Sequence, residues 1–300
     1  ANSNSSHKSE TTRFSRSSDE YTKYQADFLL NYNKKIGNHR IGALLGYTAR
    51  MQVGQGFNAS TDSLISGSTW IVPQDFWMLS AGADQNRGNG DWYNAEAFTS
   101  YLSRLNYSYA DKYIAALTFR ADASSKFADN YRWGYFPSVG LAWIASEEKF
   151  FEPLKGKVDF LKLKASWGKF GNDKIGNYMM YPQINPRGQQ VVVNGVTYYL
   201  PTQANHPDTT LHWEVIKEFD AGFEAQLFKN RMKVEIDYYN KLTTDMLAFL
   251  ETSSGINSVD VTNIGSIRNS GLEFILSWND KIGKFNYGAS VNGATLNNEV

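Results

Sequence analysis

The chain has 300 residues, with 30 Lys and Arg balanced by 30 Asp and Glu, and it has no cysteine. Zero net charge argues against nucleic acid as a partner, because binding to phosphates requires a basic surplus. Without cysteine there is no disulfide scaffold, thiolate metal site or cysteine nucleophile. Aromatic residues make up 15% of the chain, a share that is high for a soluble domain and typical of the aromatic girdles of membrane β-barrels.

The sequence predicts an all-β protein. Alternating apolar and polar residues, separated by Gly, Asn and Asp, indicate about ten antiparallel strands. In chain order we expect them at residues 21–36, 40–53, 92–110, 113–123, 138–145, 160–170, 212–228, 231–245, 268–279 and 284–297. Many are longer than about 10 residues, which exceeds the usual globular strand and is enough to cross a bilayer at a tilt. No apolar run approaches the roughly 18 residues of a transmembrane helix.

Each expected strand has one apolar and one polar face. In the strand 231–245, for example, one face holds Met232, Val234 and Ile236, and the other holds Lys233, Glu235 and Asp237. A one-sided soluble sheet has the same alternation, so it is the strand length that favours a membrane barrel. In a barrel the polar residues, with their carboxylates, line the lumen.

The expected connections alternate between short and long. Short ones fall at Gly37, Asp111, Ser146, Lys229 and Asp280, and longer ones begin at Gly54, Ser124, Gly171 and Met246. Outer-membrane barrels have short periplasmic turns and long extracellular loops, and a soluble sandwich has no reason to sort its connections in this way. Within the connections we expect a helical turn near 74–79, a short helix in 146–159, and a hairpin at 190–200 that turns at Asn194-Gly195.

The stretch 124–151 combines a polar loop, an aromatic cluster at 133–137 and an apolar strand. Such a cluster suits a membrane–water interface, and it equally suits an aromatic corner in a soluble β-sandwich. Residues 124–143, SSKFADNYRWGYFPSVGLAW, also resemble the late-barrel signature of SusC/RagA-type TonB-dependent transporters of the Bacteroidetes outer membrane. One departure is Ala123, where that family usually has glycine.

Two further blocks strengthen this resemblance. Residues 161–178, LKLKASWGKFGNDKIGNY, resemble the next block of the family. Residues 211–245, which begin LHWE and contain LFKNRMKVEIDYYNKLTTD, resemble a third. The three blocks occur in the family order, so together they are far more specific than any one of them.

The resemblance implies that residues 1–300 are part of a barrel of about 22 strands. It implies TonB-dependent import of oligosaccharides or peptides through the outer membrane, with a SusD-like surface lipoprotein as lid and energy from the TonB complex. The plug domain, the TonB box and the signal peptide are expected before Ala1, so both ends are expected to be cuts through a longer protein. We also expect that this piece does not fold faithfully alone, because its two edge strands would lack partners in lipid.

No catalytic, cofactor or metal motif is evident. The resemblance implies transport work and not an enzyme. The candidate ligand-binding residues are the loop aromatics Trp70, Trp77, Trp92, Trp133, Tyr198 and Tyr199. Their flat rings could stack on sugar rings, pack the loops together or contact a lid protein. Two alternatives stay open: a passive porin or structural outer-membrane barrel, and a soluble carbohydrate-binding β-domain.

Overall fold

The computed structural model describes residues 13–62, 78–81, 87–205, 207–251 and 259–300. The chain divides into two compact units, one formed by residues 1–24 and 50–96 and the other by residues 25–49 and 97–300. Within the described residues no helix has the length and hydrophobicity needed to cross a membrane. The described elements are strands apart from three short 3₁₀ helices, as the alternation in the sequence predicted.

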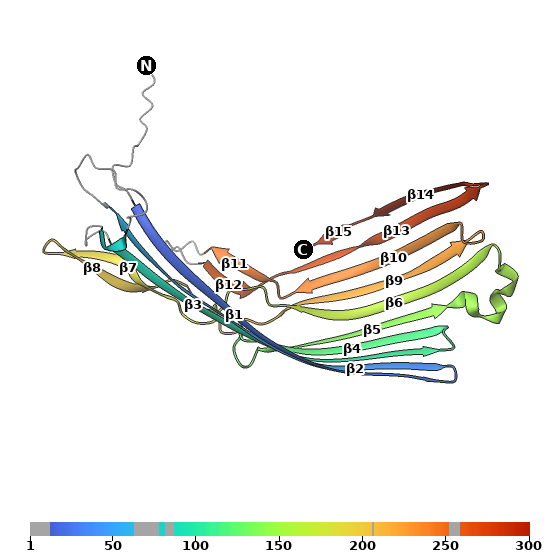
Figure 1. Cartoon of the computed structure of the whole chain (residues 1–300), viewed down its shortest axis with the longest axis horizontal. Coiled ribbons are helices and arrows are strands. Elements are labelled where there is room, and N and C mark those ends of the chain that lie inside the picture. Colours follow the sequence, from blue (N-terminus) through green and yellow to red (C-terminus); the bar gives the residue numbers. More distant parts are fainter. Residues whose placement is uncertain (1–12, 63–77, 82–86, 206, 252–258) are drawn as a thin grey trace, which may run out of the picture. The chain divides into compact units, whose positions relative to one another are not determined.

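The strands of the main sheet are all antiparallel to their neighbours (Figure 1). They are β1 Arg13–Ile36, β2 His39–Asp62, β3 Arg87–Tyr109, β4 Tyr113–Ser124, β5 Trp133–Ile144, β6 Val158–Asn172, β9 Glu214–Leu227, β10 Met232–Thr244, β13 Ser266–Ile282, β14 Phe285–Ala294 and β15 Asn297–Glu299. Their hydrogen-bonded order is β1-β2-β3-β4-β5-β6-β9-β10-β13-β14, and β15 pairs with β13. The first ten follow the ten predicted strands one by one.

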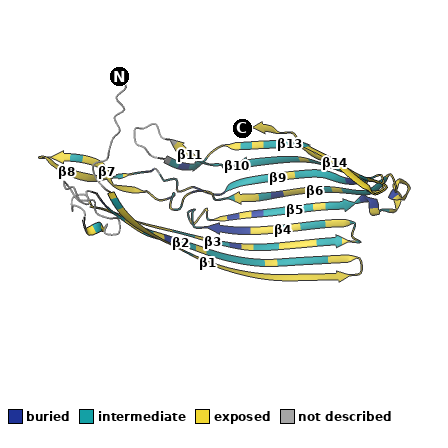
Figure 2. Ribbon diagram, turned by 45° about the horizontal axis from the view of Figure 1, so that its top comes forward, coloured by how far each residue is buried: buried dark blue, intermediate teal, exposed yellow. Residues whose placement is uncertain are grey.

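The sheet is open in this chain. Strands β1 and β14 are the two ends of the described hydrogen-bonded order and do not pair with each other. Figure 2 shows both edge strands exposed along most of their length. In a bilayer the unpaired N–H and C=O groups of such edges require neighbouring strands, so the sheet is a wall segment of a larger closed barrel.

Some boundaries differ from the prediction. The region 54–91 was expected to be a loop, but β2 continues to Asp62 and β3 begins at Arg87. These extensions are rich in polar residues and glycine. Such a composition suits the part of a strand that lies outside lipid, because that part needs no apolar face. Likewise β5 begins at Trp133, so the aromatic cluster 133–137 is strand and not a loop end.

Two small hairpins lie in the long connections. The predicted one is confirmed as β7 Ile184–Val193 and β8 Val196–Gln203, and its turn residues Asn194 and Gly195 have positive φ of 52° and 81°. The second, β11 Leu247–Glu251 paired with β12 Val259–Asn263, was not predicted, because the region 246–267 was expected to be a loop. Of the helical turn expected near 74–79, residues 74–77 lie outside the described residues, and a short 3₁₀ helix runs over Leu79–Ala81.

The short connection between β5 and β6 does contain helix, as predicted. It forms two 3₁₀ helices, Ala145–Glu147 and Lys149–Leu154. The neighbouring short turn between β3 and β4 has Ala110 and Asp111 at positive φ of 52° and 56°, which makes it tight. Both connections lie at the same end of the strands.

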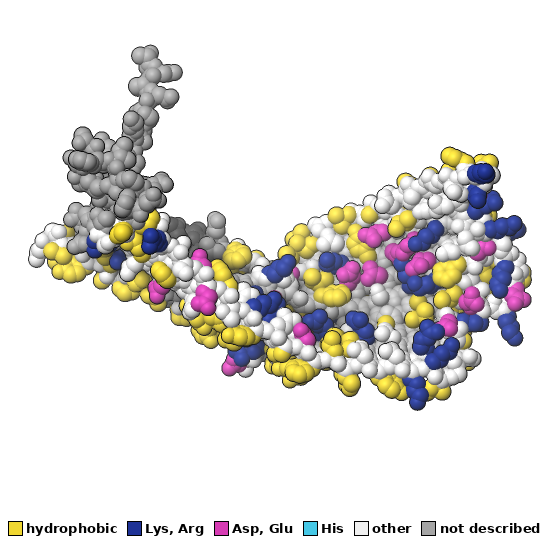
Figure 3. All heavy atoms as spheres, in the orientation of Figure 1, with side chains coloured by type: hydrophobic (Ala, Val, Ile, Leu, Met, Phe, Trp, Pro, Cys, Tyr) yellow, Lys and Arg dark blue, Asp and Glu magenta, His cyan; other side chains and the backbone are white. Residues whose placement is uncertain are grey.

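The strand register confirms the predicted faces. On one face Ile236 of β10 pairs with Phe223 of β9 and with Phe274 of β13. On the other face Glu235 pairs with Glu224, which in turn pairs with Lys162 of β6. Charged side chains gather on the hollowed face of this sheet in Figure 3. The hollowed face is therefore polar, as a barrel lumen is, and the opposite face is apolar, as a lipid-facing surface is.

Candidate functional site

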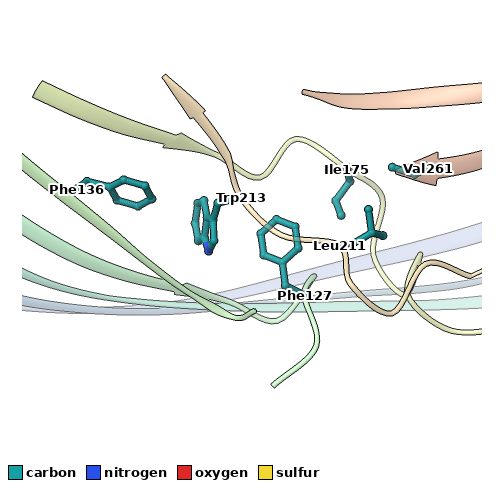
Figure 4. Close-up of a cluster of buried hydrophobic side chains, with 6 residues drawn as sticks. All are labelled: Phe127, Phe136, Ile175, Leu211, Trp213 and Val261. Carbon is teal, nitrogen blue, oxygen red and sulfur yellow. The ribbon is translucent and has the colours of Figure 1, made fainter. Parts of the chain in front are cut away.

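A buried hydrophobic cluster lies at the long-loop end of the sheet (Figure 4). Its members are Phe127, Phe136, Ile175, Leu211, Trp213 and Val261. They come from the β4–β5 loop, from β5, from the β6–β7 connection, from the segment before β9 and from β12. The cluster therefore fastens several long loops to the strand ends that carry them. We call it the loop-base cluster.

Glycines make room for the centre of the loop-base cluster. The ring of Phe136 lies so close to the backbone of Gly134 and Gly171 that a Cβ at either glycine would overlap it. Trp213 packs edge-on against Phe136, with 5.4 Å between ring centroids, and its Nε1 donates a hydrogen bond of 3.0 Å to the carbonyl of Arg132. In the motif RWGYFP the glycine is therefore needed because a larger residue would collide with the ring of the phenylalanine two positions later.

Polar side chains reinforce the loop-base cluster. The hydroxyl of Ser124 donates to Oδ2 of Asp173 over 2.8 Å, which ties the end of β4 to the end of β6. The carboxylate of Glu214 accepts hydrogen bonds from Nδ2 of Asn172 at 2.9 Å and from the amide of Leu247 at 3.1 Å. Ordering a long loop costs conformational entropy. The charge-assisted hydrogen bonds of Asp173 and Glu214 help to offset this cost.

Asp208 joins the segment before β9 to the β11–β12 hairpin. Its carboxylate accepts hydrogen bonds from the hydroxyls of Thr210 at 2.6 Å and Thr262 at 2.7 Å. Burial raises the pKa of Asp208, but the hydrogen bonds from Thr210 and Thr262 outweigh it and hold the pKa below its ordinary value. The ionised carboxylate is therefore the form that holds the hairpin in place.

A second polar group lies on the hollowed, lumenal face. Nζ of Lys164 is 2.8 Å from Oε1 of Glu235 and 3.0 Å from Oδ2 of Asp237, and Nζ of Lys162 is 3.1 Å from Oε1 of Glu224. These charges come from β6, β9 and β10. They border an open groove of about 420 Å³, whose lining includes Gly140, Ala142, Ser166, Asp220 and Glu273. Nζ of Lys233 also lies 3.6 Å from Oε2 of Glu235. The carboxylates still outnumber the lysines here, so this part of the lumen attracts cationic groups.

The structure places the predicted ligand-binding residues in separate environments. Trp70 and Trp77 lie outside the described residues. Trp92 is in β3, where its Nε1 donates to Oδ1 of Asp19 at 3.0 Å and its ring lies 5.5 Å from that of Tyr21. These contacts pack Trp92 within its own unit.

The other predicted aromatics belong to the larger unit. Trp133 begins β5 on the lipid-facing side and stacks on Tyr101 with 6.0 Å between ring centroids. Tyr198 and Tyr199 are exposed on β8, and the guanidinium of Arg187 lies 5.4 Å from the centroid of the Tyr199 ring. Trp133 is placed as a girdle residue would be, whereas Tyr198 and Tyr199 remain candidates for contact with a ligand or a partner.

Alternation in the sequence puts Lys164 on the polar face of its strand but does not show its ion pairs. Sequence reasoning did not identify Asp208 or the polar residues Ser124, Asp173 and Glu214 beside the loop-base cluster. The signal for the cluster was present, because Phe127, Phe136, Ile175 and Trp213 all lie inside the three resemblance blocks. What the sequence alone could not show is that these blocks converge in space.

A hollowed, polar lumenal face, an apolar outer face, short turns at one end and large folded loops at the other define the wall of an outer-membrane β-barrel. A family model described as "TonB dependent receptor-like, beta-barrel" matches residues 1–300. The chain belongs to this family and is located in the outer membrane. The two soluble alternatives, a β-sandwich and a carbohydrate-binding domain, are therefore wrong.

Comparison with individual proteins confirms the SusC/RagA resemblance. The chain is 31% identical to TonB-dependent receptor P26 of Formosa agariphila over 90% of the chain and 27% of that protein. It is 34% identical to TonB-dependent receptor SusC of Bacteroides thetaiotaomicron over 67% of the chain and 20% of that protein. A solved structure of the RagAB peptide transporter superimposes with a TM-score of 0.75 and 26% identity, over 96% of this chain and 31% of the other. The chain thus spans roughly a quarter of the length of the curated relatives.

Proposed function

We propose that this chain supplies barrel wall and extracellular loops to a TonB-dependent importer of oligosaccharides or peptides. The observation that carries the proposal is the lumenal face, where charged side chains of β6, β9 and β10 line a hollow next to an open groove. A lumen lined by paired charges suits the docking of a plug domain, which an active importer needs and a passive porin does not. The plug, the TonB box and the signal peptide belong to the part of the protein before Ala1 in this proposal.

The partners proposed for the whole protein are a SusD-like surface lipoprotein and the TonB complex. Support for the lid comes from the resemblance to SusC and to the RagAB peptide transporter. The large loops anchored by the loop-base cluster lie at the end of the barrel where a surface lid would dock. The exposed rings of Tyr198 and Tyr199 offer a contact surface there for a sugar, a peptide or the lid.

Uptake by cells tests the proposal. The full-length gene is expressed in a host with an intact TonB complex and in the same host without TonB, and uptake of labelled oligosaccharides and peptides is measured. Saturable uptake that disappears without TonB is the expected result. Uptake that is unaffected by the loss of TonB and does not saturate would identify a passive porin instead.

A further inference from the structure

The short-turn end of β4 and β5 carries an aromatic pair whose polar groups meet one carboxylate. Tyr113 and Trp143 are paired across the strands on the lipid-facing side. Oε1 of Glu148, in the β5–β6 connection, accepts a hydrogen bond of 2.7 Å from the Tyr113 hydroxyl and one of 3.5 Å from the Trp143 Nε1. Nζ of Lys112 lies 3.4 Å from Oε2 of the same carboxylate and neutralises it. These contacts fix the two rings at the short-turn end of the strands, where a membrane barrel carries an aromatic girdle.

The short 3₁₀ helix Lys149–Leu154 lies against this aromatic pair. Phe151 is buried with 4% of its surface exposed, and it anchors the segment. Phe150 lies with its ring centroid 6.2 Å from that of Trp143, and yet it is 65% exposed, as is 46% of Leu154. In a bilayer, lipid would cover these apolar side chains and remove them from water.

An apolar groove of about 460 Å³ begins at the same aromatic pair. Small residues create it, because Ala115 pairs with Leu141 and Leu141 with Ala165, one step along the strands from Tyr113 and Trp143. The next residues on this face, Leu117, Val139 and Trp167, line a second groove of about 460 Å³. The two grooves follow one another along the strands, so that an apolar path leads from the short-turn end along the lipid-facing side.

Charged residues of both signs lie in the connection at the beginning of this path, where Glu147 and Glu152 accompany its lysines and Glu148 is paired with Lys112. Lys149, Lys155 and Lys157 belong to the β5–β6 connection, and Lys229 belongs to the neighbouring turn between β9 and β10. Figure 3 shows Lys and Arg side chains gathered at this end of the sheet. Lys149 directly follows Glu148, whose charge Lys112 already neutralises, so a basic residue, an aromatic pair and an apolar groove follow one another from water into the membrane. These match the phosphate, glycerol and acyl chain of a glycerophospholipid.

We propose that this surface is a binding site for one glycerophospholipid of the periplasmic leaflet. An acyl chain lies in the groove over Ala115 and Ala165, the glycerol region lies at Tyr113 and Trp143, and the phosphate is bound near Lys149. The site holds the β5–β6 connection against the membrane through Phe150.

Native mass spectrometry of the purified full-length protein tests the site. The protein is released from detergent in the presence of palmitoyl-oleoyl phosphatidylglycerol, and retained lipid is counted as the collision energy rises. Ala115→Trp fills the groove and Lys149→Gln removes the phosphate contact, while Ala289→Trp on β14 and Lys284→Gln in the β13–β14 turn are the matched controls. We expect the wild type and both controls to retain one lipid. Ala115→Trp should lose it, and Lys149→Gln should retain it about fivefold more weakly.

Two further results would overturn the proposal. Equal loss of lipid from the site variants and from the controls would show only the general lipid coat of a barrel. Dissociation of a protein dimer by Ala115→Trp, with lipid retention unchanged, would show that the groove is a contact between two barrels. Heat-modifiable migration of each variant on gels, which reports a folded barrel, ensures that a loss of lipid is not a loss of fold.

Discussion

Lys164 of β6 reaches over β9 to Asp237 of β10, with 3.0 Å between Nζ and Oδ2. The residue between them in the register is Gly222 of β9, which pairs with Lys164 on one side and with Asp237 on the other. A Cβ at Gly222 would overlap both the Asp237 carboxylate and the backbone carbonyl of Ile236. The missing side chain of Gly222 is what lets charges on two non-adjacent strands meet.

Gly222→Ala should therefore destabilise the barrel. The added methyl group pushes the Asp237 carboxylate away from Lys164, and overpacking of this kind costs about 1–3 kcal/mol. The measurement is the temperature at which the full-length barrel loses its folded migration on gels. Gly140→Ala is the matched control on the same lumenal face, because its Cβ would meet only the Cβ of Ser166 at an ordinary 3.9 Å. Equal effects of the two substitutions would show that the bridge over Gly222 does not matter.

A charge on the lipid-facing side should be much more harmful than one in the lumen. Val234 pairs with Ala225 and Leu276 on the apolar face, so Val234→Arg places a cation in lipid at a cost of about 2–4 kcal/mol near the bilayer midplane. Asn292→Arg on the lumenal face of β14 is the control. Assembly into the outer membrane is measured by surface labelling of intact cells. Normal assembly of Val234→Arg would mean that the two faces are assigned the wrong way round.

Glu235→Gln should have only a small effect on assembly. The amide keeps an oxygen that can accept a hydrogen bond from Lys164, and the lost charge is one of several carboxylates around that lysine. For a partly exposed ion pair we expect a loss of at most about 1 kcal/mol in thermal stability of the barrel. A severe folding defect would contradict the placement of Glu235 on the lumenal face.

The two faces and the strand order could be predicted from the sequence because both depend on local patterns. Alternation at Met232, Val234 and Ile236 sets one face of β10 whatever its neighbours are, and Asn194-Gly195 sets a tight turn by its own backbone preference. Strands that follow one another in the chain usually pair, and here the predicted strands pair in sequence order across short turns and long loops alike. These features need no knowledge of distant contacts.

The loop-base cluster and the bridge at Lys164 could not be predicted in the same way. Phe127 and Trp213 are far apart in the sequence, and only the folded loops bring their ring centroids to 5.3 Å. The β11–β12 hairpin was missed because its strands are short and are stabilised by contacts such as that of Thr262 with Asp208. Polar strand extensions such as the end of β2 lack the apolar alternation that marks a strand in lipid.

Gly171→Ala should loosen the loops by disturbing the loop-base cluster. The new methyl group would overlap the Phe136 ring, which is fixed by Trp213 and cannot move without breaking their edge-on contact. We expect a loss of about 1–3 kcal/mol and faster cleavage of the long loops by external protease. A double variant that adds Phe136→Leu to Gly171→Ala should regain part of the lost stability, because the smaller side chain leaves room for the methyl group. Failure of this rescue would show that Gly171 is needed for another reason.

The anchoring of the β11–β12 hairpin should weaken in acid. The pKa of Asp208 in the folded protein is below its ordinary value of 3.8, so the carboxylate stabilises the folded loop above pH 3.8. This contribution is lost as the pH falls through the lowered pKa. Protonation removes the negative charge that strengthens the hydrogen bonds from the two threonine hydroxyls. Hydrogen exchange at Thr210 and Thr262, corrected for the intrinsic rate at each pH, should show opening at low pH only. Asp208→Asn should open the loop at neutral pH and remove most of the pH dependence, whereas an unchanged pH profile in this variant would assign the acid sensitivity to another group.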